Sequence, residues 1–219
     1  YHYAQLLFAV AVDQASYATV GTAARFWAVW KEAEGPELLE AVNTPLPTAT
    51  RDQLFGWRVH GARDREYLEH LEDEGGRGVT EQDRLLWALA RPRRLLDLAS
   101  KFSVFDAGER KVARYQQYRC VEKAMARIAH RDAEGRRLGG IVWHTQGSGK
   151  SLTMVMLAEA IFRDPTIAAP KIVLVTDRVD LDDQIYGAFK HCGADLQQAT
   201  TGQNLLELLA DPRTRIVTT

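Results

Sequence analysis

The chain has 219 residues, of which 46% are hydrophobic and 26% are charged, and its formal net charge is −1 at pH 7. These values are typical of globular domains and exclude a collagen, a disulfide-rich scaffold and a wholly disordered chain. A net charge near zero also excludes a protein that coats nucleic acid through bulk positive charge, so any contact with DNA needs a local groove.

No segment of the sequence predicts a membrane anchor. The longest apolar run, Leu6 to Val12, is far shorter than the ~20 residues that cross a bilayer, and no basic leader precedes it. We therefore expect a soluble, cytoplasmic protein with two reduced thiols, Cys120 and Cys192, and no disulfide. The chain lacks an initiator Met and stops inside the apolar, β-branched stretch 215–219, which predicts a segment of a longer protein.

The first third of the sequence predicts a hairpin followed by a long connection. Two β-rich runs flank a polar turn within residues 5–20 and predict the hairpin, and residues 26–30 form a third short apolar run. Prolines, an acidic cluster and a group of glycines then predict a mixed linker over residues 31–78, with one helix near residues 63–71.

Helical signals dominate the next part of the chain. Thr80 precedes two acids and an apolar stripe and predicts a helix start, and Pro92 fits the first turn of a second helix. Residues 103–106 predict a short strand before an Ala-Gly turn. Apolar residues at i, i+3, i+4 and i+7 spacing within residues 113–129 predict an amphipathic helix.

The last third of the chain alternates between apolar runs and helical periods. This alternation predicts a parallel α/β sheet with flanking helices. The expected order is a strand at 140–143, a helix at 150–162, a strand at 171–176, helices at 181–192 and 205–209, and a strand at 215–219.

One loop carries the clearest chemical signal, and it lies between the first of these strands and the first of these helices. It reads His144, Thr145, Gln146, Gly147, Ser148, Gly149, Lys150, Ser151. Two glycines let the backbone curl so that its N–H groups face a phosphate at a helix N-terminus. Lys150 can reach the β- and γ-phosphates of a nucleotide, and the Ser151 hydroxyl can hold Mg²⁺. The loop therefore predicts a P-loop.

The loop departs from the strict pattern at its first position, where His144 replaces a glycine. We expect His144 to frame the nucleotide rather than to act as a base. Hydrolysis also needs an acid on a neighbouring strand, and Asp177 ends the apolar run that begins at Ile172. By spacing alone, Asp177 is a Walker B candidate, which leaves a kinase-like or GTPase-like enzyme as an alternative. A nucleotide-sensing module without hydrolysis is a further alternative.

The amino-acid sequence around this loop closely resembles that of a known family. Residues 139–154 resemble the motor (restriction, R) subunit of type I restriction endonucleases, in which histidine is usual at the position of His144. Residues 175–184 resemble the next block of that family. Residues 113–118 resemble its adenine-reading Q motif, with Gln117 as the best fit and Arg114 nearby.

The resemblance implies an ATP-dependent DNA translocase and endonuclease of superfamily-2 helicase type, which uses ATP and Mg²⁺ to pull duplex DNA before cutting it. Lys150 would be the catalytic residue, and the ATP site would comprise Arg114, Gln117 and residues 144–151, with Ser151 on Mg²⁺. Thr176 and Arg178 would face the DNA. Asp177 would then not be the Walker B acid, which is expected beyond the last residue of the chain, and the nuclease centre is expected before the first.

The same resemblance divides the chain into three parts. Residues 1–32 would be the end of a nuclease domain, residues 33–102 a linker and helical connector, and residues 103–219 the N-terminal part of a first RecA-like P-loop NTPase lobe. The implied partners are double-stranded DNA and the methyltransferase and specificity subunits of a type I complex, with no membrane. The segment alone is expected to bind nucleotide but neither to hydrolyse it efficiently nor to cut DNA.

Overall fold

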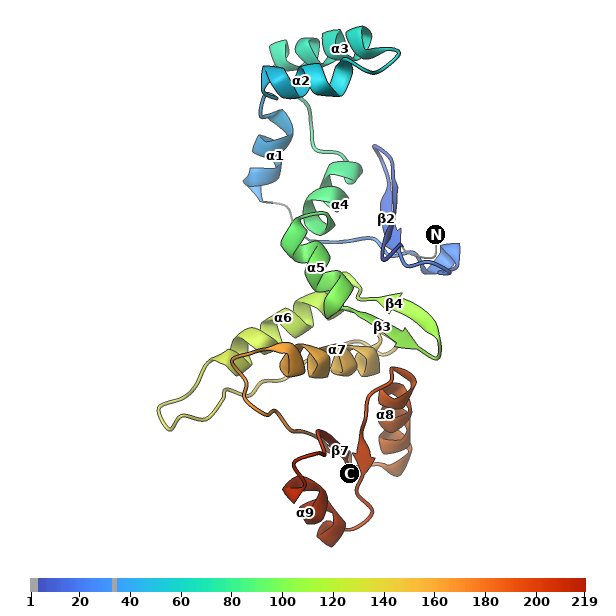
Figure 1. Cartoon of the computed structure of the whole chain (residues 1–219), viewed down its shortest axis with the longest axis vertical. Coiled ribbons are helices and arrows are strands. Elements are labelled where there is room, and N and C mark those ends of the chain that lie inside the picture. Colours follow the sequence, from blue (N-terminus) through green and yellow to red (C-terminus); the bar gives the residue numbers. More distant parts are fainter. Residues whose placement is uncertain (1–3, 33–34) are drawn as a thin grey trace.

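The computed structural model describes residues 4–32 and 35–219. The first three residues of the expected nuclease-domain tail and residues 33–34 of the expected linker therefore lie outside the described residues. The elements form an elongated column, with the helices of residues 48–73 at one end and the helix of residues 202–210 at the other (Figure 1). Within the described ranges, no helix combines the length and the apolar character needed to cross a bilayer.

The predicted N-terminal hairpin is confirmed. Strand β1 (Leu7–Val10) pairs antiparallel with β2 (Ala15–Ala18), and a short 3-10 helix, η1 (Ala24–Phe26), follows. The third apolar run does not form a strand of its own but returns beside β2 through one bridge, between Tyr17 and Ala28. The hairpin and the returning segment therefore form one small N-terminal unit.

The linker predicted for residues 31–78 is wrong in its details, because its described residues contain helices α1 (Pro36–Asn43), α2 (Thr48–Phe55) and α3 (Gly61–Asp73). The prolines begin helices here instead of breaking them: Pro36 occupies the first turn of α1, and Pro47 precedes α2. Only α3 was expected. An ion pair of 2.8 Å between Arg51 Nη2 and Glu72 Oε2 links α2 to α3.

Both predicted helices of the connector are confirmed as α4 (Glu81–Leu89) and α5 (Pro92–Ser100). Thr80 caps α4, since its hydroxyl accepts from the Asp83 N–H while the Asp83 carboxylate accepts from the Thr80 N–H. Strand β3 (Ser103–Asp106) is confirmed as well, and its partner β4 (Glu109–Val112) was not predicted.

An aromatic cluster joins the N-terminal unit to helix α6 (Tyr115–Ala129), which confirms the predicted amphipathic helix. Trp30 makes edge-to-face contacts with Tyr17, Tyr115 and Tyr118, with ring centroids 5.5 to 5.8 Å apart. The buried Tyr17 hydroxyl donates to the carbonyl of Ala113 over 2.8 Å, and burial raises the pKa of Tyr17 far above its ordinary value. The N-terminal unit thus holds in place the segment that leads into α6.

The C-terminal third forms a parallel sheet, as predicted, with strand order β5-β7-β6, but strand β6 was not predicted. Its elements are α7 (Lys150–Arg163), β5 (Ile172–Leu174), α8 (Val179–His191), β6 (Gln197–Gln198), α9 (Gly202–Ala210) and β7 (Ile216–Thr218). Helix α7 packs against α6 and α8 (Figure 1). Cys120 and Cys192 are free, and burial raises the pKa of both thiols.

The strand expected at residues 140–143 is absent, and this prediction is wrong. Ile141 and Trp143 are 95% and 90% exposed, so the apolar run is extended without a neighbouring strand among the described residues. A strand needs a neighbouring strand with which its backbone N–H and C=O groups form hydrogen bonds. Strands β5, β7 and β6 pair with one another and not with residues 140–143. The apolar composition of residues 140–143 therefore predicted a strand that does not form.

The hydrogen bond from Tyr17 to Ala113 predicts a specific loss of stability. Tyr17→Phe should lower the free energy of unfolding by about 1–2 kcal/mol, because it leaves the buried Ala113 carbonyl without its donor. Urea unfolding followed by circular dichroism measures the effect. Tyr67→Phe is the control, since Tyr67 is 64% exposed on α3, and an equal loss in both variants would contradict the assignment.

Candidate nucleotide-binding site

The predicted loop and helix are both present at residues 144–163, although the strand before them is not. Gly147 and Gly149 have φ angles of +75° and +80°, in the left-handed region that favours glycine, and Gly149 is the N-cap of α7. The backbone therefore curls directly in front of the helix, whose N-terminal N–H groups favour an anion.

Lys150 folds back over this loop. Its Nζ donates to the carbonyl oxygens of His144 and Thr145, at 3.1 and 2.9 Å. The Ser148 hydroxyl donates to the same Thr145 carbonyl over 2.7 Å and closes the turn. The ammonium group thus lies over the loop, where a polyphosphate would meet it.

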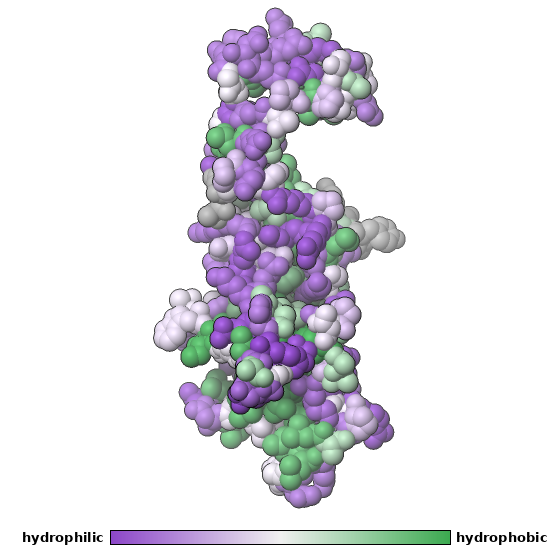
Figure 2. All heavy atoms as spheres, turned by 90° about the vertical axis from the view of Figure 1, so that its left-hand side faces the viewer, coloured by the Kyte–Doolittle hydropathy of each residue, from purple (hydrophilic) through white to green (hydrophobic). Residues whose placement is uncertain are grey.

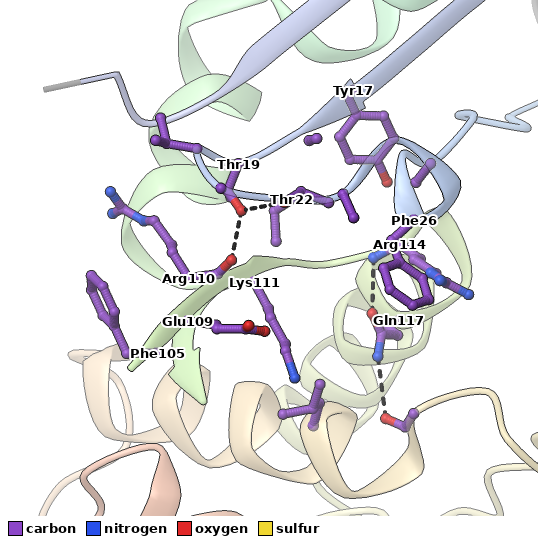
Figure 3. A pocket seen from close by; sticks show the side chains of 18 of the residues that line it. Tyr17, Thr19, Thr22, Phe26, Phe105, Glu109, Arg110, Lys111, Arg114 and Gln117 are labelled. Atoms are coloured by element: carbon purple, nitrogen blue, oxygen red, sulfur yellow. Dashed lines mark hydrogen bonds between the residues drawn. The ribbon is translucent and has the colours of Figure 1, made fainter. Parts of the chain in front are cut away.

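Gln117 is the residue that connects this loop to another part of the chain. Its side chain is 5% exposed; Oε1 accepts from the Arg114 N–H at 2.8 Å, and Nε2 donates to the Gly149 carbonyl at 3.2 Å. One amide therefore bridges the N-terminus of α6 and the N-terminus of α7 (Figure 3). The sequence predicted that Gln117 and the loop share a site, and the structure brings them into contact.

The remaining predicted residues of the loop surround this contact. The ring of His144 is half-buried, and its Nδ1 is buried without a hydrogen-bond partner among the described residues. Thr145 and Gln146 are exposed, and Ser151 is half-buried in the first turn of α7. Arg114 is the N-cap of α6 and is exposed.

A cavity of about 970 Å³ opens beside the loop, and Arg114, Gln117 and residues 147–149 line one end of it. The other walls come from segments that sequence reasoning did not connect with the site (Figure 3). They include Thr19, Thr22, Phe26, Arg110 and Lys111. No motif marks these residues, because they reach the site only through the packing of the N-terminal unit on β4 and α6.

The predicted DNA-facing residues lie apart from this cavity. Thr176 and Arg178 occupy the turn between β5 and α8, and neither lines the cavity. The Arg178 guanidinium pairs with Asp180 at 2.6 Å, and both side chains are exposed. Asp177, the alternative Walker B acid, is exposed in the same turn and does not line the cavity either.

The geometry of Gly149 predicts that alanine is not tolerated there. An added Cβ would lie 2.7 Å from Gln117 Nε2, and a φ of +80° strains any L side chain. Gly149→Ala should lower the free energy of unfolding by about 1–2 kcal/mol, as judged by urea denaturation. Gly202→Ala at the start of α9, where an added Cβ meets nothing within 4 Å, is the control and should be neutral. Equal behaviour of the two variants would contradict the account.

Comparison with known proteins supports the family resemblance. Residues 116–219 match the family model described as SWI2/SNF2 ATPase, and this range includes Gln117 and the whole glycine loop. The chain is 32% identical over 176 residues to the "Putative type I restriction enzyme MjaIXP endonuclease subunit" of Methanocaldococcus jannaschii, covering 74% of this chain and 17% of that protein.

A second relative gives the same result. The chain is 34% identical over 165 residues to the "Type I restriction enzyme HindI endonuclease subunit" of Haemophilus influenzae, covering 70% of this chain and 15% of that protein. The chain thus spans about one sixth of the length of these relatives. The resemblance predicted from the motifs is confirmed: the chain is related to the endonuclease subunits of type I restriction enzymes, as a segment whose second half is similar to SWI2/SNF2 ATPases.

Proposed function

We propose that the chain is the nucleotide-binding segment of a type I restriction subunit, in which ATP and Mg²⁺ drive translocation of duplex DNA before cleavage. The observation that carries this proposal is the hydrogen bond between Gln117 and Gly149. It unites the Q-motif-like segment and the P-loop-like segment at one cavity, where a single nucleotide would contact both. The endonuclease activity belongs, in this proposal, to the longer protein.

The loop residues supply the phosphate end of the site. Backbone N–H groups at residues 147–151 and the dipole of α7 would bind the phosphates, and the Lys150 ammonium would exchange its two carbonyl partners for β- and γ-phosphate oxygens. The Ser151 hydroxyl, in the first turn of α7, would hold Mg²⁺. When bound, Mg²⁺ neutralises charge that develops on the phosphates during transfer.

The base end of the site would involve Gln117 and Arg114. The amide of Gln117 uses one lone pair and one N–H in the contacts described above, so a second acceptor site and a second donor remain for a purine edge. His144, Thr145 and Gln146 would frame the nucleotide from the opposite side of the loop. The donor set therefore fits a nucleoside triphosphate rather than a phosphate ion alone.

The rest of the catalytic apparatus lies, in this proposal, in other parts of the subunit. Residues 103–219 would form the N-terminal part of a RecA-like lobe, preceded by a nuclease-domain tail (1–32) and a connector (33–102). Thr176 and Arg178 would face DNA from the turn that follows β5, where Arg178 is exposed and Thr176 is half-buried. The methyltransferase and specificity subunits would complete the complex, and the segment alone would bind ATP without efficient hydrolysis.

Lys150 gives the direct test. In the full-length subunit with its partner subunits, Lys150→Ala should reduce DNA-stimulated ATP hydrolysis by about 100-fold or more, since it removes the cation that stabilises transferred charge. Phosphate release with and without long duplex DNA measures this, and Lys190→Ala, at the far end of α8, should leave turnover unchanged.

Two results would contradict the proposal. Turnover that persists in Lys150→Ala would exclude the loop as the ATP site. Turnover that depends on Lys150 but ignores DNA would favour the kinase-like alternative, in which Asp177→Asn should then abolish activity.

A further inference from the structure

The cavity beside the glycine loop has chemically different walls. Gly147, Ser148 and Gly149 form a polar wall at the start of α7. Another wall comes from the N-terminal unit, where Val20, Ala23, Phe26 and Ala28 supply apolar surface. A cavity with a polar wall at a helix N-terminus and an apolar wall suits a ligand that combines a charged group with a flat, apolar one.

Phe26 is the one aromatic side chain of this N-terminal wall that stands out from the core. It ends η1, and its ring is 54% exposed, whereas Tyr17 on the same wall is fully buried. The guanidinium of Arg25 lies 4.8 Å from the ring centroid of Phe26, and Arg25 does not line the cavity. One face of the ring is therefore covered by a cation, and the ring borders the cavity with the remainder of its surface.

The position of Phe26 relative to the polar groups is also specific. Phe26 lies on the same side of the cavity as Arg114 and Gln117, and Gln117 is bonded to Gly149 of the glycine loop (Figure 3). Phe105, the other exposed phenylalanine of the cavity, lies at the opposite end, on β3 (Figure 3). Of these two rings, only Phe26 lies on the side of the cavity that Gln117 occupies (Figure 3).

The segment that carries Phe26 is firmly held against the rest of the site. The Thr19 hydroxyl donates to the Arg110 carbonyl over 2.6 Å, and Trp27 Nε1 donates to the Thr22 carbonyl over 3.1 Å. Together with the bond between Tyr17 and Ala113, these contacts fix η1 over the cavity. A backbone segment held in this way loses little conformational freedom when the site binds a ligand.

We propose that Phe26 is a stacking surface for the purine base of the nucleotide whose phosphates bind at residues 147–151. This inference rests on the proposed function and adds a residue from the N-terminal unit to the nucleotide site. Aromatic rings stack on the π-face of any base. Gln117 would then bind the edge of the base while Phe26 covers its face.

Isothermal titration of the chain with ATP and with inorganic triphosphate separates the two ends of the site. Phe26→Ala should weaken ATP binding by about tenfold, because it removes the stacking surface, and should leave triphosphate binding unchanged. Phe26→Trp should retain ATP binding. Phe105→Ala is the matched control, since it removes an exposed ring of the same cavity that also lies near an arginine, and it should leave ATP binding unchanged.

Each other result identifies which claim fails. ATP binding that is lost in Lys150→Ala but unchanged in Phe26→Ala would overturn the inference and leave the proposed function standing. Equal losses for ATP and triphosphate in Phe26→Ala would also overturn it, because Phe26 would then act through the loop. Absence of any Lys150-dependent ATP binding would overturn the proposed function and this inference with it.

Discussion

The site depends on the buried side-chain amide of Gln117, which forms hydrogen bonds with two segments of the chain at once. The Gly149 carbonyl accepts from the Thr153 N–H at 3.0 Å, from the Thr153 hydroxyl at 3.1 Å and from Gln117 Nε2 at 3.2 Å. Gln117 also accepts from the Arg114 N–H, so its side chain is held at both ends. In a buried site a lost partner leaves a polar group unsatisfied, which makes this small network resistant to rearrangement.

The second constraint is the packing of the N-terminal unit on the same region. Trp30 contacts aromatic side chains from both β2 and α6, and Tyr17 holds the backbone directly before α6. Phe26, near the start of the chain, thereby lines the same cavity as the glycine loop, which follows it by more than 100 residues in the sequence. In the proposed function, the nuclease-domain tail would thus contribute to the nucleotide site of the motor, and events in the two parts would be physically coupled.

Local signals predicted much of the fold. The Thr80 cap, Pro92 and the apolar stripe of residues 113–129 each specify a helix through interactions within a few residues, and all three helices are present. The glycines of the loop likewise predicted that its backbone curls, and both have positive φ angles in the structure. These features depend on neighbouring residues alone, which is why the sequence is sufficient for them.

The errors arose where contacts between residues that are distant in the sequence determine the structure. Residues 140–143 have the composition of a buried strand, but no described strand pairs with them, and the prolines near α1 and α2 begin helices that lacked a clear apolar period. The cavity wall from Thr19 to Phe26 carries no motif and becomes part of the site only through tertiary packing. Gln117 could be found from its motif-like context, but its bond to Gly149 is visible only in the structure.

The most direct test of the central claim is photolabelling of the chain with 8-azido-ATP, followed by mapping of the modified peptides. If residues around Gln117 and the glycine loop form one nucleotide site with the N-terminal unit, the azide on the base should label peptides that contain Phe26 or residues 114–118, and excess ATP should prevent the labelling. Label concentrated in the turn at residues 175–180, or label that ATP does not displace, would contradict the account.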